Sequence, residues 1–298
     1  MFVISTMIAF ITWGFVSIFY KITGKVDENT HLKTGILVGL TMGIHATIYM
    51  IYKGLDFNFI DMLKYLPISI LYIASMVIGY RGYKFIEISI SSPIQNSSGV
   101  ITAILFVIFF KEVYDLPFYI ACILIIIGVI ILSIDEIKGT KDKRKEFKKS
   151  NGLKKLFILA IMFPLIYSLF DGVATFLDGV YLDKLKIIEA DSALIVYEYT
   201  FFIYGIITYF YLRKKSPGVK LFNEWNLILC ALCEMIGQVF YVYAMAKNAT
   251  IAAPIIGSYC VLTMLLSRII LKEKLSKIEY IGIFLVLFGV IILALLDV

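Results

Sequence analysis

"ISISSPIQNSSGVITAILFVIFFKEVYD", residues 88–115, recurs in altered form as "ATIAAPIIGSYCVLTMLLSRIILKEKLS", residues 249–276. Pro93 matches Pro254, and Lys111-Glu112 matches Lys272-Glu273, each pair 161 positions apart. The stretch "GVIIL" at residues 128–132 returns at residues 289–293 with the same offset. A fixed offset across such different residue types indicates an internal repeat. The chain is therefore predicted to consist of two related halves.

The composition predicts that both halves lie in a membrane. The 298 residues are 60% hydrophobic and 17% charged, with a mean hydropathy of +0.90, whereas soluble domains average about 45–50% apolar and about 25% charged residues. Apolar runs of about 17–25 residues suit a bilayer, and they must be helical because lipid offers no hydrogen bonds to the backbone. Ten such spans are predicted, at residues 2–20, 34–52, 65–83, 90–110, 117–134, 156–177, 191–212, 225–246, 251–271 and 278–296.

Five spans per half is an odd number, so the second half must enter the membrane from the opposite side. The predicted fold is an all-α integral membrane protein, with ten transmembrane helices as two inverted five-helix repeats around a central cavity. We expect the first repeat at residues 1–135, a basic connector at 136–155 and the second repeat at 156–298.

The loop charges predict an orientation in the membrane. Loops that follow odd-numbered spans hold 22 of the 28 Lys and Arg residues, and the other loops hold 6. Because basic loops stay cytoplasmic, both chain ends are expected outside and the connector inside. We expect a multi-pass protein of the cell membrane.

The stretch at 88–115 also places polar groups within a span. Gln95 and Asn96 lie on one helical face with several small residues, and unpaired polar groups on a lipid-facing helix are costly. The serines and Gly99 fit close helix packing, but two adjacent amides do not. We expect Gln95 or Asn96 to contact a substrate, although Ile256 and Gly257 stand at the matching positions.

Carboxylates within three later spans are further candidates, because ionisable groups inside membranes are rare and usually functional. The candidates are Asp171, Glu198 and Glu234, which helical geometry allows to converge. The alternatives are an interfacial place for Asp171, a packing hydrogen bond for Glu198 and a buried pair for Glu234. Asp178 and Asp191 are expected at the membrane interface, and His45 in helix packing, with a proton relay as the alternative.

Aromatic and amide side chains accompany these acids. Tyr167 shares a helical face with Asp171, while Gln238 and Tyr241 share one with Glu234. Together with Trp13, the tyrosines are candidates for a cage around a cationic amine, and lipid-facing or interfacial positions are the alternative.

Pro93 and Pro254 each remove a helical hydrogen bond, so they are candidate gating hinges. Both lie near the predicted start of a span, where proline is tolerated, and a plain helix-start role is the alternative.

"TWGFVSIFYK" at residues 12–21 and "AKNATIAAPIIGSYCVLTMLLSRIILKEKLS" at 246–276 resemble the EamA family of the drug/metabolite transporter superfamily. The resemblance implies ten helices, two repeats and a central cavity, in transporters of amino acids, nucleobases, amines, sugars and drugs. It also implies cytoplasmic chain ends, opposite to the orientation that the loop charges predict. The second half departs from the first-helix Trp-Gly signature, having Phe170-Asp171-Gly172 instead.

We therefore expect a secondary transporter, and an exporter, that moves a small organic metabolite by alternating access. The excess of acids within spans favours a cationic or zwitterionic amine or amino acid, with protons or another ion as a coupling partner. The expected partners are the substrate and the lipid bilayer, with no cofactor, metal or nucleic acid. No protease, nucleotide-binding or nucleophile motif indicates an enzyme. A non-transporting membrane scaffold or sensor is the alternative, which a sealed, dry interior would favour.

Overall fold

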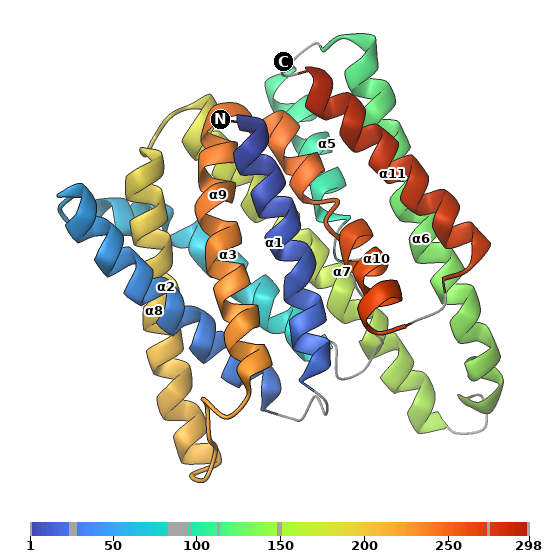
Figure 1. Ribbon diagram of the computed structural model, residues 1–298, viewed down its shortest axis with the longest axis horizontal. Coiled ribbons are helices and arrows are strands. Elements are labelled where there is room, and N and C mark those ends of the chain that lie inside the picture. Colours follow the sequence, from blue (N-terminus) through green and yellow to red (C-terminus); the bar gives the residue numbers. More distant parts are fainter. Residues whose placement is uncertain are drawn as a thin grey trace.

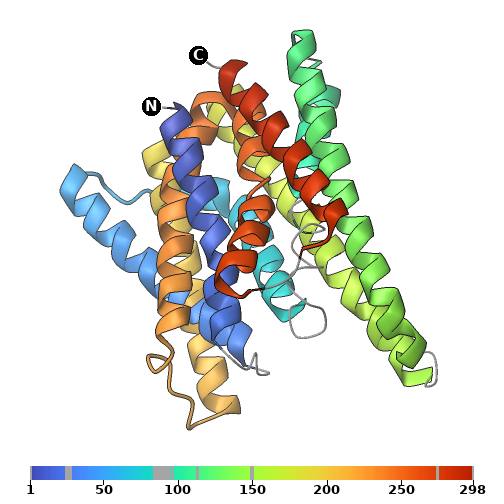
Figure 2. The same ribbon diagram turned by 45° about the vertical axis from the view of Figure 1, so that its right-hand side comes forward.

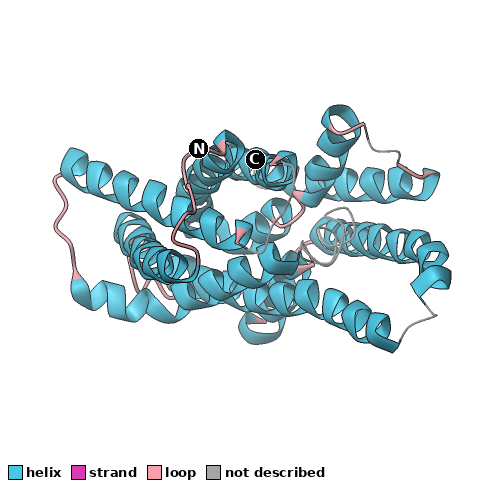
Figure 3. Ribbon diagram, turned by 90° about the horizontal axis from the view of Figure 1, so that it is seen from below, coloured by secondary structure: helices cyan, strands magenta, loops and turns pink. Residues whose placement is uncertain are grey.

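The computed structural model describes residues 2–23, 29–82, 95, 97–111, 114–147, 151–272 and 275–296. These residues form helices and short connections without a strand (Figure 3). The helices are α1 (Phe2–Ile22), α2 (Thr30–Lys53), α3 (Phe59–Gly82), α5 (Ser98–Phe110), α6 (Leu116–Phe147), α7 (Asn151–Gly179), η1 (Val180–Lys184), α8 (Ala190–Lys215), α9 (Trp225–Ile256), α10 (Cys260–Ile270) and α11 (Lys277–Leu296). The prediction of an all-helical chain is confirmed.

Seven of these helices are long and apolar enough to cross a membrane, and α5, α6 and α10 contain shorter apolar segments. Their outward faces carry large apolar side chains: Ile51 and Ile269 are each 73% exposed, and Phe210 is 67% exposed. Such a surface is unfavourable in water but suits lipid. α6 and α7 also continue through most of the predicted connector.

The ninth predicted span, residues 251–271, is not one continuous helix. α9 covers residues 225–256 with a kink at Asn248, whose φ and ψ are −159° and 87°. The side chains of Asn248 and Asp183 accept hydrogen bonds from the backbone of Ile251 (3.2 Å) and Ala249 (3.0 Å), which restarts the helix after the kink. α9 then ends at Ile256, and the turn at 257–259 separates it from α10.

The helices pack in pairs that join the first half of the chain to the second. α2 lies against α8 at one end of the molecule, and α6 lies against α11 at the other (Figures 1 and 2). Between these pairs, α1 packs on α9 and α7 packs on α3. α1 begins and α11 ends on the same side of the bundle, at the top of Figure 1.

Several contacts between the halves occur twice. A residue of the second half contacts the first half, and the matching residue of the first half contacts the second half in the same way. The Thr263 hydroxyl donates to the backbone oxygen of Gly14 at 3.0 Å, and Thr102, 161 positions earlier, donates to Gly172 at 2.9 Å. A Cβ atom at Gly237 would lie 2.3 Å from the Trp13 ring of α1. In the same way, one at Gly79 would lie 2.7 Å from the ring of Tyr167, on α7. Glycine is needed at 79 and 237 for these aromatic rings to approach.

The α6–α11 contact is reciprocal as well. A Cβ atom at Gly128 would lie 2.5 Å from a methyl carbon of Val286, and one at Gly289 would lie 2.8 Å from the side chain of Ile125. Because Gly289 and Val286 are 161 positions after Gly128 and Ile125, the two contacts correspond. Small residues at these crossings allow the helix backbones to approach closely, as is typical of helix pairs in membranes.

Candidate functional site

A cavity of about 80 Å³ lies between the two halves. Its walls come from α1, α3, α7, α8 and α9, from the beginning of α5 and from the turn after α9. That volume admits a few water molecules, each of which occupies about 30 Å³ in the liquid. The polar and aromatic residues of the wall are Trp13, Ser17, Tyr72, Ser75, Tyr80, Gln95, Ser98, Tyr167, Asp171, Thr175, Tyr197, Phe201, Glu234, Gln238, Tyr241 and Tyr259.

The structure brings most of the predicted site residues to this cavity. Those that line it together are Trp13, Gln95, Tyr167, Asp171, Glu234, Gln238 and Tyr241. Glu198 is not in the cavity wall. Asn96 and Pro93 lie outside the described residues. Pro254 is buried within α9, where its Cα is 3.5 Å from the position of a Cβ at Gly99.

Two carboxylates belong to the cavity wall. Asp171 of α7 and Glu234 of α9 are close enough for their charges to repel when both are ionised. Ser98 and Tyr167 are placed to donate hydrogen bonds to Asp171. Glu234 has no hydrogen-bond or ion-pair partner among the described residues, and no Lys, Arg or His side chain from that part of the chain lines the cavity. The cavity therefore concentrates negative charge.

The wall also holds two hydrogen-bond donors without partners. The Trp13 ring nitrogen Nε1 and the Gln238 amide nitrogen Nε2 are buried and lack an acceptor among the described residues. Gln238 is only 2% exposed. A buried donor without an acceptor costs about 1–3 kcal/mol, so a ligand or a rearrangement that brings an acceptor to either nitrogen would be favoured.

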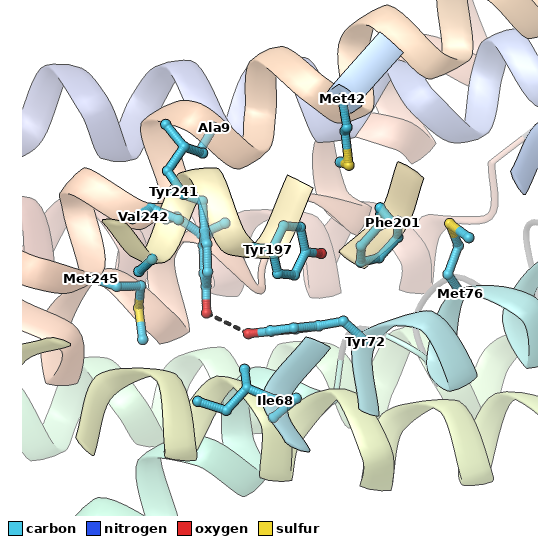
Figure 4. Packing of buried hydrophobic residues seen from close by; sticks show 14 of the residues in the cluster. Ala9, Met42, Ile68, Tyr72, Met76, Tyr197, Phe201, Tyr241, Val242 and Met245 are labelled. Atoms are coloured by element: carbon cyan, nitrogen blue, oxygen red, sulfur yellow. Dashed lines mark hydrogen bonds between the residues drawn. The ribbon is translucent and has the colours of Figure 1, made fainter. Parts of the chain in front are cut away.

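A cluster of tyrosine hydroxyls closes the cavity near the C-terminal end of α7. The Tyr72 hydroxyl is 2.6 Å from that of Tyr241 and 3.1 Å from Thr175 Oγ1 (Figure 4). Tyr65 donates to Asp178 Oδ1, and Tyr72 lies 3.5 Å from the other oxygen of the same carboxylate.

Asp178 is buried within the protein, because its side chain is 0% exposed and held by tyrosines. Its position at the membrane interface stays a prediction, and it lies next to the end of α7. A sequence signal was available: Tyr167, Asp171, Thr175 and Asp178 follow one another at helical spacing on one face of α7. Tyr72 and Tyr65 carried no such signal, because single tyrosines in an apolar span also suit lipid or the interface.

Glu198 lies on the side of α8 that faces α2. Its carboxylate oxygens are 2.8 and 3.0 Å from Nδ1 of His45. The Glu198 side chain is fully buried, whereas that of His45 is 24% exposed. The packing hydrogen bond considered for Glu198 is thus present, and its partner is the histidine of the neighbouring helix.

Apolar outer faces and an enclosed polar cavity define an integral membrane protein built around a central site. The sequence model of the EamA-like transporter family matches residues 1–134 and 192–295. The chain therefore belongs to this family of membrane transporters, and the resemblance seen in the sequence is confirmed.

Two individual proteins extend this comparison. The uncharacterized protein MJ1333.1 of Methanocaldococcus jannaschii is 33% identical over 140 residues, which is 46% of this chain and 96% of the relative. The relative is therefore about half as long as this chain. A protein solved by crystallography shares the fold, with a TM-score of 0.67 and 12% identity over 98% of this chain and 96% of that one.

Proposed function

We propose that this protein is a secondary transporter of the cell membrane that exports a small metabolite carrying a positive charge. The single observation that carries the proposal is the cavity between the halves, where Asp171 and Glu234 meet without a described cationic side chain. Two neighbouring acids in a cavity between helices are costly without a counterion, and a substrate ammonium group or a proton supplies the missing charge.

The aromatic wall favours an organic cation. The Trp13 ring lies 5.1 Å from that of Tyr241 and 6.1 Å from that of Tyr259. Ring faces attract ammonium groups, by about 2 kcal/mol or more when water is excluded. Trp13, Tyr241 and Glu234 together offer an amine both its counterion and an aromatic surface.

The unpartnered donors favour a substrate that also carries an acceptor. The indole nitrogen of Trp13 and the amide of Gln238 are buried without an acceptor, and a carboxylate or carbonyl oxygen of the substrate would satisfy them. An ammonium group and an acceptor on one small molecule describe a zwitterionic amine such as an amino acid. Gln95 is buried in the same wall, with 2% exposure.

Reciprocal contacts support an alternating-access mechanism. Thr102 and Thr263 bond equivalent carbonyls, and the glycines of α6 and α11 pack in matching ways. These contacts favour two inverted repeats, at residues 1–135 and 156–298, that exchange conformations about the cavity. The half-length relative is also expected if one repeat is the elementary unit of the family. Pro254, buried beside Gly99 where the halves cross, keeps its place as a candidate hinge together with Pro93.

The second candidate function is a non-transporting scaffold or sensor. A scaffold has no need of acids and orphan donors in its interior, and each of them lowers its stability. The polar cavity therefore favours transport over this alternative.

The experiment is a ligand screen by thermal unfolding of the purified protein, followed by uptake into proteoliposomes. Amino acids, simple amines, neutral sugars and carboxylic acids form the panel. A ligand present at 100 times its Kd stabilises the folded state by about 2.7 kcal/mol, so we expect amines or amino acids to raise the melting temperature.

The variants Glu234→Gln and Asp171→Asn should abolish this ligand shift, while Glu189→Gln, an exposed acid before α8, should retain it. Counterflow of the same ligand across the proteoliposome membrane then tests transport, and loading from each side tests the export direction. Stabilisation only by anions or neutral compounds, or an undiminished shift in both acid variants, contradicts the proposal.

A further inference from the structure

The pair of His45 and Glu198 is a second charged site at membrane depth, separate from the cavity. Nδ1 of His45 lies 2.8 Å from one carboxylate oxygen of Glu198 and 3.0 Å from the other. Neither residue lines the cavity. We propose that this pair between α2 and α8 is a proton-binding site whose occupancy controls the transport cycle.

The two partners differ in exposure. Glu198 is fully buried, whereas His45 retains 24% exposure, so the histidine is the more accessible partner. The ring of His45 stacks on Tyr49 at 5.7 Å, which fixes its orientation. Histidine is also the residue whose charge changes most readily near neutral pH.

The surrounding charges do not neutralise the pair. Within the described residues, each partner is the only charged group that acts on the other. Near the end of α2, Lys53 faces Asp191 at 3.9 Å. Asp191 also accepts hydrogen bonds from Tyr49 and from Tyr243 of α9. The charge of Asp191 is therefore met by these neighbours and not by the His45–Glu198 pair.

On the other faces of α8, the titratable neighbours are tyrosines and one acid. Tyr65 and Tyr72 of α3 pack on the ring of Tyr197, and Tyr199 bonds Thr47. Glu234 of α9 acts on Tyr197 rather than on the pair. Any titration of the pair is therefore distinct from that of the cavity acids.

The chemistry at the pair is the gain or loss of one proton. With one proton shared, the pair is an imidazolium beside a carboxylate. Loss of that proton leaves a neutral imidazole, whose Nδ1–H tautomer still donates a hydrogen bond to Glu198. The buried carboxylate has then lost its counter-charge, which disfavours the packed state. The protonated pair therefore holds α2 and α8 together, and the deprotonated pair weakens their contact.

The α2–α8 contact transmits this change to the cavity. A Cβ at Gly39 of α2 would lie 2.4 Å from the backbone oxygen of Phe201 on α8, so the two backbones touch. Tyr197, the residue before Glu198, lines the cavity and packs on Tyr72 (Figure 4). A displacement of α8 at Glu198 therefore moves the cavity wall. Because the site lies outside the cavity, a proton bound at the pair does not occupy the space of a substrate. The role of this proton in transport rests on the proposed function. The binding of a proton at the pair does not depend on it.

The first test measures protonation directly. The chain has two histidines, His31 and His45, so the His31→Gln variant leaves one histidine signal in an NMR pH titration of the detergent-solubilised protein. We expect this signal to titrate reversibly, and proton affinity to fall at least about tenfold when Glu198→Gln is added. A signal that does not respond to pH, or one that Glu198→Gln leaves unchanged, overturns the proposal.

The second test asks whether the proton reaches the cavity. The two tryptophans are Trp13 in the cavity wall and Trp225 at the exposed start of α9, so Trp225→Phe makes Trp13 a single fluorescent reporter. We expect its emission to change with pH at the midpoint found for His45, and this change to vanish in His45→Gln and in Glu198→Gln but to persist in His31→Gln. The double variant His45→Gln/Glu198→Gln, in which two amides can bond, controls for lost folding.

An emission change that survives in all His45 and Glu198 variants, or that follows only Asp171→Asn or Glu234→Gln, assigns the proton to the cavity and overturns the proposal. Both tests need no substrate. A failure to find a transported amine therefore refutes the proposed function without touching the proton site, and loss of the proton site leaves ligand binding in the cavity intact.

Discussion

Asp178 shows how a single buried residue sets the geometry of the cavity wall. Its carboxylate receives the hydroxyl of Tyr65 and lies near that of Tyr72, which in turn meets Tyr241. The hydroxyl chain therefore ties α3, α7 and α9 together at one end of the cavity. This buried carboxyl group therefore acts as a structural anchor for the hydroxyls of two other residues.

We expect Asp178→Ala to destabilise the protein by about 1–3 kcal/mol, because the Tyr65 hydroxyl is left buried without its acceptor. Asp178→Asn, which keeps one acceptor, should be milder. Thermal unfolding in detergent measures both, and Asp56→Ala, at an exposed loop position, serves as the control. Equal melting temperatures for the Asp178 and Asp56 variants would show that the hydroxyls find other partners.

The sequence predicted the residues of the cavity better than their partners. Asp171, Glu234 and Gln95 could be selected because polar groups within an apolar span need a protein or water environment. Tyr72 and Tyr65 could not, because tyrosine is equally common at the membrane interface. Glu198 was selected for the same reason as the other acids, but helical periodicity alone did not show that it faces α2 and His45.

At the level of elements, the spans were predictable and their interruptions were not. Runs of apolar residues located α1, α2, α8 and α11 within a few residues, and they located the start of α6 but not its end. The turn at 257–259 falls in "APIIGSYC". Its mostly apolar residues are as compatible with a continuous helix as with a helix end, so the turn was not predicted. The kink at Asn248 depends on Asp183, which caps the restarted helix from a distant part of the chain.

Two helices end on a lysine with left-handed backbone geometry. Lys111 after α5 has φ 50°, and Lys272, just beyond α10, has φ 56°. These lysines are 161 positions apart, so the repeat extends to an unusual backbone conformation. A residue with a side chain pays about 1–2 kcal/mol for this region, which glycine enters freely.

We therefore expect Lys111→Gly and Lys272→Gly each to raise stability by about 0.5–1 kcal/mol, after the entropy cost of glycine in the unfolded chain. The matched control is Lys64→Gly inside α3, which should lower stability by about 1 kcal/mol. Melting temperatures in one detergent compare the three. A loss of stability in both end variants would indicate that the lysine side chains, rather than the backbone, stabilise these turns.

On the scale of the whole molecule, the halves meet through small residues at matching positions. A Cβ at Gly128 would lie 2.5 Å from Val286 and 2.8 Å from the backbone oxygen of Gly282, and one at Gly289 would lie 2.8 Å from that of Ala121. α6 and α11 therefore approach until their backbones touch. The 161-residue offset in the sequence predicted which residues correspond, although not that these two helices pair.

We expect Gly128→Val and Gly289→Val to destabilise the protein by similar amounts, about 1–3 kcal/mol each, because added methyl groups force the helices apart. Gly218→Ala, at a loop position with no atom within 4 Å of the added carbon, should be neutral. Thermal unfolding of the three variants tests this. A large effect at only one of the two glycines would contradict equivalent roles for the halves.

The uneven distribution of lysine and arginine has a consequence for biosynthesis. In the first half, basic residues gather at the end of its first span, and in the second half they gather before its first span. If the halves are the inverted repeats proposed above, these charges are expected to orient them in opposite directions during insertion. A free-standing single repeat would have to insert in both directions to form the same bundle, which requires nearly balanced flanking charges. When both repeats are joined in one polypeptide, balanced flanking charges are no longer needed. Each half can then carry charges that select one orientation in the membrane.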